Sequence, residues 1–262
     1  MKSNYNNQIT AEASALRFGT ACRYGFFDRH GGLGTAPFNS MNVSYGVGDR
    51  EKTVLENRRR IQKISGSSFL LSAKQVHGDS IYSQTVPLEK NREVADVDAL
   101  ITDQQGIGLM IQQADCQAVL LFDPVKKIVA AVHCGWRGSV INILGKVVRR
   151  MISSFGVDAG DLLAAISPSL GPCCAEFVNY KKELPAEFRP FMMREDYFDF
   201  WQISKYQLAS AGLAELHIKM VGSCTCCSKN YFSYRRSNHF SDGVTGRNCS
   251  VIVIDKVNQV KC

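Results

Sequence analysis

Two apolar runs separated by a short polar turn dominate the middle of the chain. Residues 118–122 and 128–132 are aliphatic or aromatic, and Asp-Pro and two lysines lie between them. Because Asp followed by Pro favours a turn, this pattern predicts two buried antiparallel strands with a tight connection. The pairing would place Cys116, just before the first strand, near His133 at the end of the second.

A thiol and an imidazole that converge at one end of a sheet have more than one interpretation. They form either a nucleophile–base pair or part of a zinc site. The alternative is structural, because cysteine is among the most buried residue types and a histidine at a strand end is often only hydrogen-bonded. The rest of the chain has to decide between these interpretations.

The remaining hydrophobic pattern predicts a mixed chain without an internal repeat. Helices are expected from an Asp49 cap to about residue 64, and at 139–151, 175–183 and 203–211. Strands are expected at residues 23–28, 69–77, 80–86, 97–102, 162–166, 215–221 and 249–254, with 69–77 and 80–86 forming a hairpin. The elements do not alternate regularly and no linker divides them, so we expect an α+β fold in one domain over residues 1–262, with a loosely held start at 1–17.

Composition narrows the class of protein. The chain has 262 residues, of which 45% are hydrophobic and 21% charged, as is ordinary for a globular protein. Its net charge of +7 suits an anionic ligand, but the basic residues are dispersed, which favours a small phosphate-bearing substrate over nucleic acid. We see no signal peptide, and no run reaches the roughly 18 apolar residues of a membrane span. Ten cysteines without a secretion signal are expected to be reduced, in a cytoplasmic protein.

The histidines point to a metal. His77 and His133 both lie at predicted strand ends, and Cys116 lies at a strand start. Two imidazoles and one thiolate with an open fourth position are typical of a catalytic zinc site, where zinc lowers the pKa of water or polarises a leaving group. The spacings of 39 and 17 residues are not a local ligand motif, so such a site depends on tertiary contact.

The segment after His133 adds a possible anion site. Gly135-Trp136-Arg137-Gly138-Ser139 leads directly into the predicted helix. A helix N-terminus and a guanidinium would then lie beside the Cys/His pair, and both favour an anion such as phosphate.

Other motifs carry weaker signals. The glycine-rich loop at 30–34 matches neither a P-loop nor a dinucleotide fingerprint. His30 and His239 are placed in polar loops, where they are either exposed or line a pocket, and His217 in an apolar strand, as a core or surface histidine. Residues 231–236 interleave aromatics with arginines, which suits base stacking and phosphate binding as well as a strand with solvated arginines.

A second group of cysteines also raises the question of a metal. An all-thiolate zinc site would use members of the set Cys173, Cys174, Cys224, Cys226 and Cys227. The C-x-C-C pattern is not a common zinc spacing, and the first two of these cysteines are adjacent. We therefore interpret these residues as reduced packing cysteines.

Seven short motifs in a fixed order resemble one known family. They are Lys74-Gln75-Val76-His77-Gly78, Ala114-Asp115-Cys116, His133-Cys134-Gly135-Trp136-Arg137-Gly138, Gly171-Pro172-Cys173-Cys174, Cys224-Thr225-Cys226, Phe232-Ser233-Tyr234-Arg235-Arg236 and Thr245-Gly246-Arg247. The family is described as YfiH-like, as a polyphenol oxidase laccase domain, and as purine nucleoside phosphorylases with adenosine deaminase activity. The resemblance covers roughly residues 20–255.

The resemblance implies a fold, a metal and an activity. The implied fold is a single-domain α+β sandwich of αββα type with mixed sheets. The implied cofactor is Zn²⁺, with Cu²⁺ taken up by exchange, and the implied ligands are His77, Cys116 and His133. The implied reactions are phosphorolysis of adenosine, inosine, guanosine and methylthioadenosine, and hydrolytic deamination of adenosine.

The resemblance also suggests residues for each role. The candidate catalytic residues are Cys116, His77, His133 and Asp115, and the candidate substrate and phosphate contacts are Arg137, Gln75, Arg58, Asn42 and Arg235. Asp115, next to Cys116, would support the site or transfer a proton, and the alternative is that it caps a turn. The expected partners are a small nucleoside and phosphate, without nucleic acid or membrane, and we expect a monomer or a weak homodimer. Gln112-Gln113 stand where the family commonly has Arg-Thr, Cys134 replaces a frequent alanine, and the segment 237–242 is longer than usual. These departures bear on substrate preference more than on the metal.

Three alternatives remain open at this stage. A multicopper oxidase needs on the order of ten histidines for its copper sites, and this chain has five, so laccase-like oxidation is expected only as a side activity of exchanged copper. A cysteine hydrolase would use Cys116 as nucleophile and His133 as base on an amide such as a cell-wall precursor. A non-enzymatic protein would use the same pocket only to bind a component of the division or envelope machinery.

Overall fold

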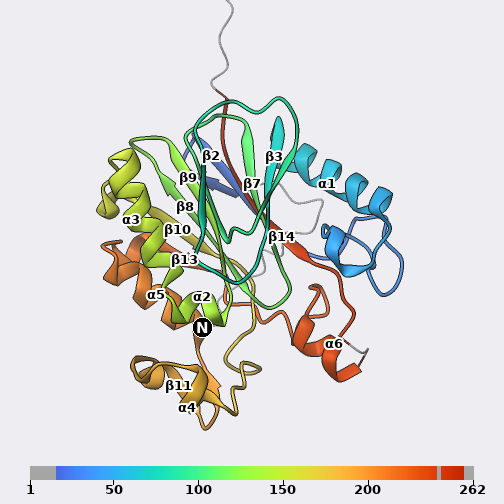
Figure 1. Cartoon of the computed structure of the whole chain (residues 1–262), viewed down its shortest axis with the longest axis vertical. Helices are drawn as coiled ribbons and strands as arrows, with labels where there is room; N and C mark the ends of the chain where they lie inside the picture. Colours follow the sequence, from blue (N-terminus) through green and yellow to red (C-terminus); the bar gives the residue numbers. More distant parts are fainter. Residues whose placement is uncertain (1–15, 241–242, 257–262) are drawn as a thin grey trace, which may run out of the picture.

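Two six-stranded sheets pack face to face, with helices on both outer faces (Figure 1). The computed structural model describes residues 16–240 and 243–256. Helix α1 (Glu51–Ser65) covers the first sheet, and α3 (Ile143–Phe155) and α5 (Phe200–Ser210) cover the second. This arrangement confirms the expected α+β sandwich. No helix in the described ranges combines the length and the apolar character needed to cross a membrane.

The first sheet is mixed, with β14 at its centre. Strand β14 is antiparallel to both of its neighbours, β2 and β7, while β3 is parallel to β7 and β5. In spatial order the strands are β1 (Leu16–Phe18), β2 (Cys22–Phe27), β14 (Asn248–Ile254), β7 (Ile107–Gln113), β3 (Phe69–Lys74) and β5 (Arg92–Ala95).

The second sheet contains the strand pair predicted from the Asp-Pro turn. Strands β8 and β9 are antiparallel, and Ala118 lies opposite His133, so Cys116 and His133 meet at one end of the sheet as expected. In spatial order the strands are β13 (Ile218–Met220), β10 (Leu163–Ile166), β8 (Gln117–Asp123), β9 (Ile128–Cys134), β6 (Ala99–Thr102) and β4 (Ile81–Gln84).

Shorter elements complete the fold. The hairpin of β11 (Met192–Arg194) and β12 (Tyr197–Phe198) packs near α5 with α4 (Tyr180–Glu183) (Figure 1). Helix α2 (Trp136–Val140) precedes α3, and α6 (Tyr234–Phe240) precedes β14. The 3₁₀ turns are Tyr45–Val47, Ala159–Asp161, Ala186–Phe191 and Glu215–His217.

The core occupies three layers because the central strands are buried on both faces. In β8, Leu120 and Phe122 face the first sheet, whereas Val119 and Leu121 face α3 and α5. Burying one such side chain contributes about 1.5–3 kcal/mol relative to leaving it exposed. The sheets therefore form a rigid frame, and the loops at their ends are held in fixed positions.

The expected hairpin of 69–77 with 80–86 is wrong. Strand β3 lies in the first sheet and β4 in the second, where β4 pairs with β6. The connection turns because His77 adopts a left-handed φ of 60°, and Asp98 accepts hydrogen bonds from the amides of Val76, His77 and Gly78. The chain thus crosses from the first sheet to the second at the turn that contains His77.

Several predicted element boundaries also need correction. The helix expected at 139–151 is split, because Asn142 has a φ of 51° and caps α3. The helix expected at 175–183 is reduced to α4, and the run 231–236 opens α6 and is not a strand. His217 ends a 3₁₀ turn and so does not lie within a strand. Asp49 does not cap helix α1 as expected. The helix begins after Arg50, and the Asp49 carboxylate accepts a hydrogen bond from the Arg50 amide, which lies before the helix.

The start predicted to be loosely held falls mostly outside the described residues. Only positions 16 and 17 of that range are described, and both belong to β1, which pairs with β2. The single-domain expectation fits the continuous sandwich but stays a prediction for the full length.

Candidate active site

Three side chains from different elements converge at one end of the sandwich. His77 follows β3, Cys116 precedes β8, and His133 lies near the end of β9. Their ligand atoms lie within 4.8 Å of one another, and the Cys116 sulfur is 3.8 Å from the His77 Nε2. The sequence prediction that these residues meet is confirmed. Two imidazoles and a thiolate at these separations are able to hold a metal ion.

The buried carboxylate of Asp98 organises this group. Its Oδ1 lies 2.7 Å from the Nδ1 of His133 and accepts the backbone amide of His77, and its Oδ2 accepts the amides of Val76 and Gly78. With Nδ1 engaged by the carboxylate, His133 has its Nε2 free for the site. Carboxylates commonly orient metal-binding histidines in this way. One side chain therefore fixes both histidines.

The thiol and the imidazole stabilise each other's charged forms. Partial burial alone would raise the pKa of Cys116, but the charge of His133 and hydrogen bonds from His133 and His77 lower this pKa to about 6. Burial likewise opposes protonation of His133, yet the Cys116 thiolate and Asp98 raise its pKa to about 9. The lowered pKa of Cys116 favours its thiolate, which is the form that binds metals and attacks electrophiles.

The group leaves no room for a side chain at Gly135. A Cβ at this position would lie 2.8 Å from the Cys116 sulfur and 3.2 Å from the His77 ring. If a metal ion binds here, we expect Gly135→Ala to weaken its binding roughly 10- to 100-fold, as other disturbances of ligand orientation do. Competition with a chromogenic chelator measures this, and Gly160→Ala, in an exposed turn outside the cavity, is the control. Unchanged affinity in the Gly135 variant would contradict the tight packing of the site.

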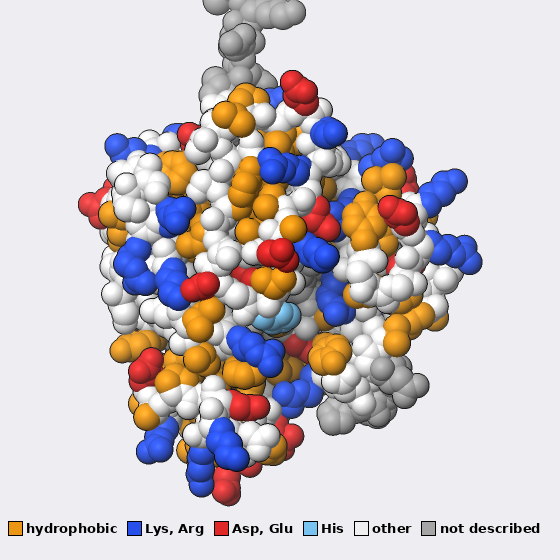
Figure 2. Space-filling model, viewed as in Figure 1, with side chains coloured by type: hydrophobic (Ala, Val, Ile, Leu, Met, Phe, Trp, Pro, Cys, Tyr) orange, Lys and Arg blue, Asp and Glu red, His pale blue; other side chains and the backbone are white. Residues whose placement is uncertain are grey.

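The three side chains lie in the wall of a cavity of about 1040 Å³. Figure 2 shows a hollow in the middle of this face, with a histidine in it and cationic side chains close by. Four cationic side chains line the cavity together with two acidic ones, and the full set is Lys74, Arg137, Arg235, Arg247, Glu93 and Asp115. Five aromatic side chains also line it, namely Tyr45, Trp136, Phe177, Phe200 and Tyr234. The cavity thus combines flat apolar surfaces with an excess of positive charge.

Of the five residues predicted to contact substrate or phosphate, three line the cavity. Arg137 lines the cavity and is exposed. Its guanidinium stacks over the Trp136 ring, 4.5 Å from the ring centroid, and no other partner of this group is seen among the described residues. Arg235 lines the cavity and donates to the Glu176 carbonyl. Gln75 lines it too, but both polar atoms of its side chain bond the backbone of Gln112. Arg137 is therefore the best-placed anion contact.

The other two predicted contacts lie behind the wall. Asn42 is fully buried and bonds Ser44 and the Arg247 amide. Arg58 is buried, pairs with Glu93 at 2.7 Å and lies under the Tyr45 ring at 4.2 Å. Both residues support groups that line the cavity and do not line it themselves.

The predicted helix N-terminus does not serve as an anion site. Helix α2 is only five residues long, and α3 starts after the break at Asn142. A single turn carries little of the macrodipole of a full helix. Positive charge in the cavity therefore comes from guanidinium and ammonium groups.

Hydrogen bonds fix the carboxylate of Asp115 in one position, which does not favour a role as a mobile proton carrier. Asp115 has a φ of 82°, and its carboxylate accepts hydrogen bonds from the Thr225 and Ser233 hydroxyls and from the Arg235 amide. Such strained backbone is stable only where its surroundings impose it, and it is typical of functional sites. The geometry favours a positioning role for Asp115, and its catalytic role stays a prediction.

Sequence reasoning missed three contributors to the site. Asp98 sits at the start of a short apolar strand, where a single carboxylate carries no periodic signal. Arg247 was noted only as part of a motif, yet it lines the cavity and is largely withdrawn from solvent. Tyr45 is in a loop without a recognisable pattern. Only the pairing of Asp98 with a nearby histidine offered a signal, and it required knowledge of the strand order.

Comparison with known proteins places the chain in a family. The family model described as "Multi-copper polyphenol oxidoreductase laccase" matches residues 23–255. The chain belongs to this family. Its relatives include "Purine nucleoside phosphorylase YlmD" of Geobacillus stearothermophilus, which is 31% identical over 242 residues covering 85% of this chain and 86% of the relative. "Purine nucleoside phosphorylase ORF3" of Streptomyces griseus is 29% identical over 242 residues, covering 90% and 95%.

Solved structures of family members share the fold. The crystal structure of YlmD from Geobacillus stearothermophilus matches with a TM-score of 0.82 and 29% identity, covering 94% of this chain and 97% of that one. The YfiH protein of Bacillus licheniformis matches with a TM-score of 0.80 and 27% identity, covering 89% and 93%. These matches confirm both the family resemblance and the fold that it implied.

Proposed function

We propose that this protein is a zinc-dependent purine nucleoside phosphorylase that also deaminates adenosine hydrolytically. The observation that carries the proposal is the convergence of His77, Cys116 and His133 in a cavity lined by guanidinium groups and aromatic rings. Relatives named purine nucleoside phosphorylases support the phosphorylase part of the proposal. The proposed substrates are small molecules, because four cationic side chains line the cavity whereas the other basic residues are dispersed along the chain.

The donor set fits a zinc ion. Thiolate and imidazole are ligands that zinc prefers, and three protein ligands leave a position open for catalysis. The hydrogen bond between His133 and Asp98 directs the imidazole for this purpose. When bound, zinc would supply Lewis-acid chemistry, which lowers the pKa of water or polarises a leaving group.

The aromatic and cationic side chains that line the cavity suit the two substrates of phosphorolysis, a purine nucleoside and phosphate. Rings such as Phe177 and Tyr45 offer faces on which a purine stacks. The Arg137 guanidinium offers two parallel N–H groups to a phosphate. Together they would hold phosphate and nucleoside side by side, which supplies the proximity that a two-substrate reaction requires.

In the proposed phosphorolysis, a phosphate oxygen forms a bond to the ribose C1′ while the bond from C1′ to the purine N9 breaks. The electron pair leaves with the purine, which takes up a proton, and the products are the free base and ribose 1-phosphate. Inosine, guanosine and methylthioadenosine would react in the same way. In the proposed deamination, a water oxygen becomes bonded to C6 of adenosine and the amino group leaves as ammonia, giving inosine.

Arg137 provides a test of the phosphate site. We expect Arg137→Gln to raise the KM for phosphate roughly tenfold, because a hydrogen bond to a charged group contributes about 1.5–3 kcal/mol when desolvated and less in an exposed position. Initial rates of inosine phosphorolysis over a range of phosphate concentrations measure this. Arg150→Gln, an exposed change on α3, is the matched control. An unaltered KM for phosphate in the Arg137 variant would place the anion elsewhere in the cavity.

A cysteine hydrolase is the second candidate, because Asp98, His133 and Cys116 also form a carboxylate–imidazole–thiol series. In such an enzyme the Cys116 sulfur would form a bond to an amide carbonyl carbon, and the amine would leave with a proton from His133. A water oxygen would then bond to the same carbon, releasing the carboxylic acid and restoring the Cys116 thiolate. Covalent trapping of Cys116 by an electrophilic amide analogue, with full activity after chelation, would favour this candidate. Stoichiometric metal and loss of activity on chelation would exclude it.

Copper chemistry has less support despite the family's descriptive name. The five histidines of the chain fall short of the number that a type 1 site and a trinuclear cluster require. We propose that oxidation of phenols, if detected, reflects copper exchanged into the His77, Cys116 and His133 group.

A chromatographic time course tests the proposal. Zinc-loaded protein is incubated with adenosine, with and without phosphate, and the products are separated. Adenine and ribose 1-phosphate formed only with phosphate establish phosphorolysis, and inosine formed without phosphate establishes deamination. If adenosine survives both incubations with folded, zinc-loaded protein, the proposal is wrong.

A further inference from the structure

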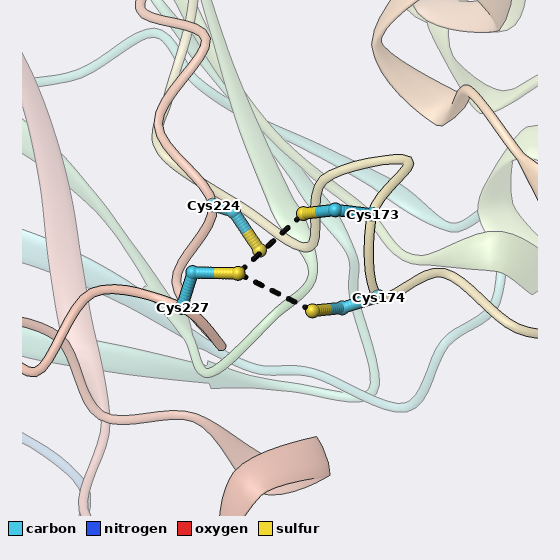
Figure 3. A group of neighbouring side chains, drawn as sticks. All are labelled: Cys173, Cys174, Cys224 and Cys227. Atoms are coloured by element: carbon cyan, nitrogen blue, oxygen red, sulfur yellow. Dashed lines mark hydrogen bonds between the residues drawn. The ribbon is translucent and has the colours of Figure 1, made fainter.

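Two loops bring four further cysteines together, outside the cavity wall. Cys173 and Cys174 lie in the loop after β10, and Cys224 and Cys227 lie in the loop after β13. All four sulfurs lie within 4.8 Å of one another, and their side chains point toward a common centre (Figure 3). The Cys227 sulfur is 3.5 Å from that of Cys173 and 3.4 Å from that of Cys174.

These separations match a tetrahedral metal site better than a disulfide. Zinc–sulfur bonds of about 2.3 Å in a tetrahedron place the sulfurs about 3.8 Å apart. A disulfide bond is about 2.05 Å long, and none of the described cysteines forms one. A disulfide joins only two sulfurs, whereas four sulfurs surround one centre here.

Packing does not account for this group. The cysteines that pack in this protein are almost completely buried, as Cys22 at 0%, Cys249 at 1% and Cys134 at 2% exposure illustrate. In contrast, Cys173 and Cys227 are exposed and the other two are partly exposed. Thiols at the surface gain little from the hydrophobic effect, so their convergence requires another explanation. The interpretation of these residues as packing cysteines is therefore not supported.

Backbone hydrogen bonds hold the sulfur of Cys224 and the turn that follows it. The Gly171 amide donates to the Cys224 sulfur at 3.3 Å, a contact that favours a thiolate. The Ser228 amide donates to the Cys224 carbonyl at 3.0 Å, which closes a turn over the C-x-x-C pair formed by Cys224 and Cys227. Sequence reasoning treated this run as C-x-C-C and so overlooked the two-residue spacing that zinc turns prefer.

We propose that Cys173, Cys174, Cys224 and Cys227 bind one zinc ion as a tetrathiolate, separate from the candidate active site. Four protein ligands leave no open position, which is typical of a structural zinc. The ion would join the loop after β10 to the loop after β13, which already meet at the bridge between Ser169 and Cys224. Without a cation, four thiolates at these distances would repel one another.

The proposed zinc would stabilise one side of the cavity. Thr225, inside the C-x-x-C turn, donates to the Asp115 carboxylate at 2.6 Å, and the Leu170 amide donates to the Asp115 carbonyl at 2.8 Å. Asp115 immediately precedes Cys116. The Arg236 guanidinium also binds the Thr225, Cys226 and Ser228 carbonyls. The two loops therefore connect the tetrathiolate directly to the backbone that presents Cys116.

Metal content of matched variants tests the assignment. Full-length protein purified with a reductant is analysed by elemental mass spectrometry, and Cys227→Ser should contain one zinc per chain less than the unchanged protein. Cys226→Ser, in the same turn but outside the group of four, should lose none. Hydrogen exchange should rise in residues 167–175 and 222–230 of the Cys227 variant. Equal zinc content in the unchanged protein and the Cys227 variant, or loss of zinc on Cys226→Ser alone, overturns the proposal.

A second measurement does not depend on whether the cluster variant folds. In Cys116→Ala protein the candidate active site lacks its thiolate ligand, so X-ray absorption at the zinc edge would report the remaining ion. We expect four sulfur ligands at about 2.3 Å. A shell dominated by nitrogen or oxygen, or a disulfide among the four cysteines together with no retained zinc, overturns the proposal. This outcome is independent of nucleoside turnover, so the proposed function can fail while the tetrathiolate stands.

Discussion

His133→Ala is expected to remove the catalytic metal and reduce nucleoside phosphorolysis by roughly 1,000-fold. Lewis-acid stabilisation by a metal is worth several kcal/mol in the transition state, and about 4 kcal/mol corresponds to this change in rate. The ring is 3% exposed and contacts both Cys116 and Asp98, so its loss removes one of the three candidate ligands. Steady-state rates and zinc content of the purified variant measure the effect.

His30→Ala is the matched control for this prediction. It removes an exposed imidazole whose only described hydrogen bond from the side chain is to Asn230. We expect its rate and zinc content to be unchanged. Full activity of the His133 variant, in folded protein, would contradict the assignment of this site.

Asp98→Asn is expected to weaken zinc binding roughly 10- to 100-fold, as loss of a carboxylate behind a metal-binding histidine typically does. Asparagine keeps one acceptor oxygen, but its amino group is a donor. This group would face the backbone N–H groups that now donate to the second carboxylate oxygen, so those N–H groups would lose their acceptor. We expect the free energy of unfolding to fall by about 1–3 kcal/mol, the cost of unsatisfied buried donors. Chelator competition and denaturant unfolding measure the two effects separately.

Asp123→Asn separates metal affinity from general stability. Asp123 is also buried, and its Oδ1 accepts the amides of Val125 and Lys126 in the turn between β8 and β9. Its Oδ2 has no hydrogen-bond partner in the described structure. The amino group of asparagine in that place would therefore not face an N–H donor. We expect this variant to keep its zinc affinity. Equal losses of zinc affinity in both variants would mean that Asp98 acts only through the fold.

The fold could be predicted where local signals agreed. The Asp-Pro turn between two apolar runs predicted the pairing of β8 with β9 to within a residue or two in register, and the observed pairing brings Cys116 to His133. Strand β7 was missed because it is buried on both faces and shows no alternation of polar and apolar residues. The pairing of β3 and β4 was wrong because the deciding contact, Asp98 to the amides at 76–78, links segments that are distant in sequence.

The candidate site was predictable to the extent that it depends on residue type. Thiol and imidazole groups are few and chemically distinctive, so His77, Cys116 and His133 could be selected before the fold was known. Arginine and asparagine are common and serve structure as often as binding, and Arg58 and Asn42 were predicted as contacts although they lie behind the wall. The choice between Cys226 and Cys227 depended on side-chain direction, which spacing does not specify.

The two cysteine-containing groups divide the work of the cavity in this account. His77, Cys116 and His133 supply the reactive centre, held by Asp98 from one side. Asp115 connects that centre to the loops of the tetrathiolate on the other side. Chemistry and rigidity are thus assigned to different side chains.

The most direct test of the central claim is phosphorus-31 NMR of zinc-loaded protein with adenosine and inorganic phosphate. We expect the phosphate signal to fall while a ribose 1-phosphate signal grows in equal amount, and we expect His133→Ala to abolish this conversion. A phosphate signal that stays constant with folded, zinc-loaded protein, whether or not adenosine is consumed, would contradict phosphorolysis at this site.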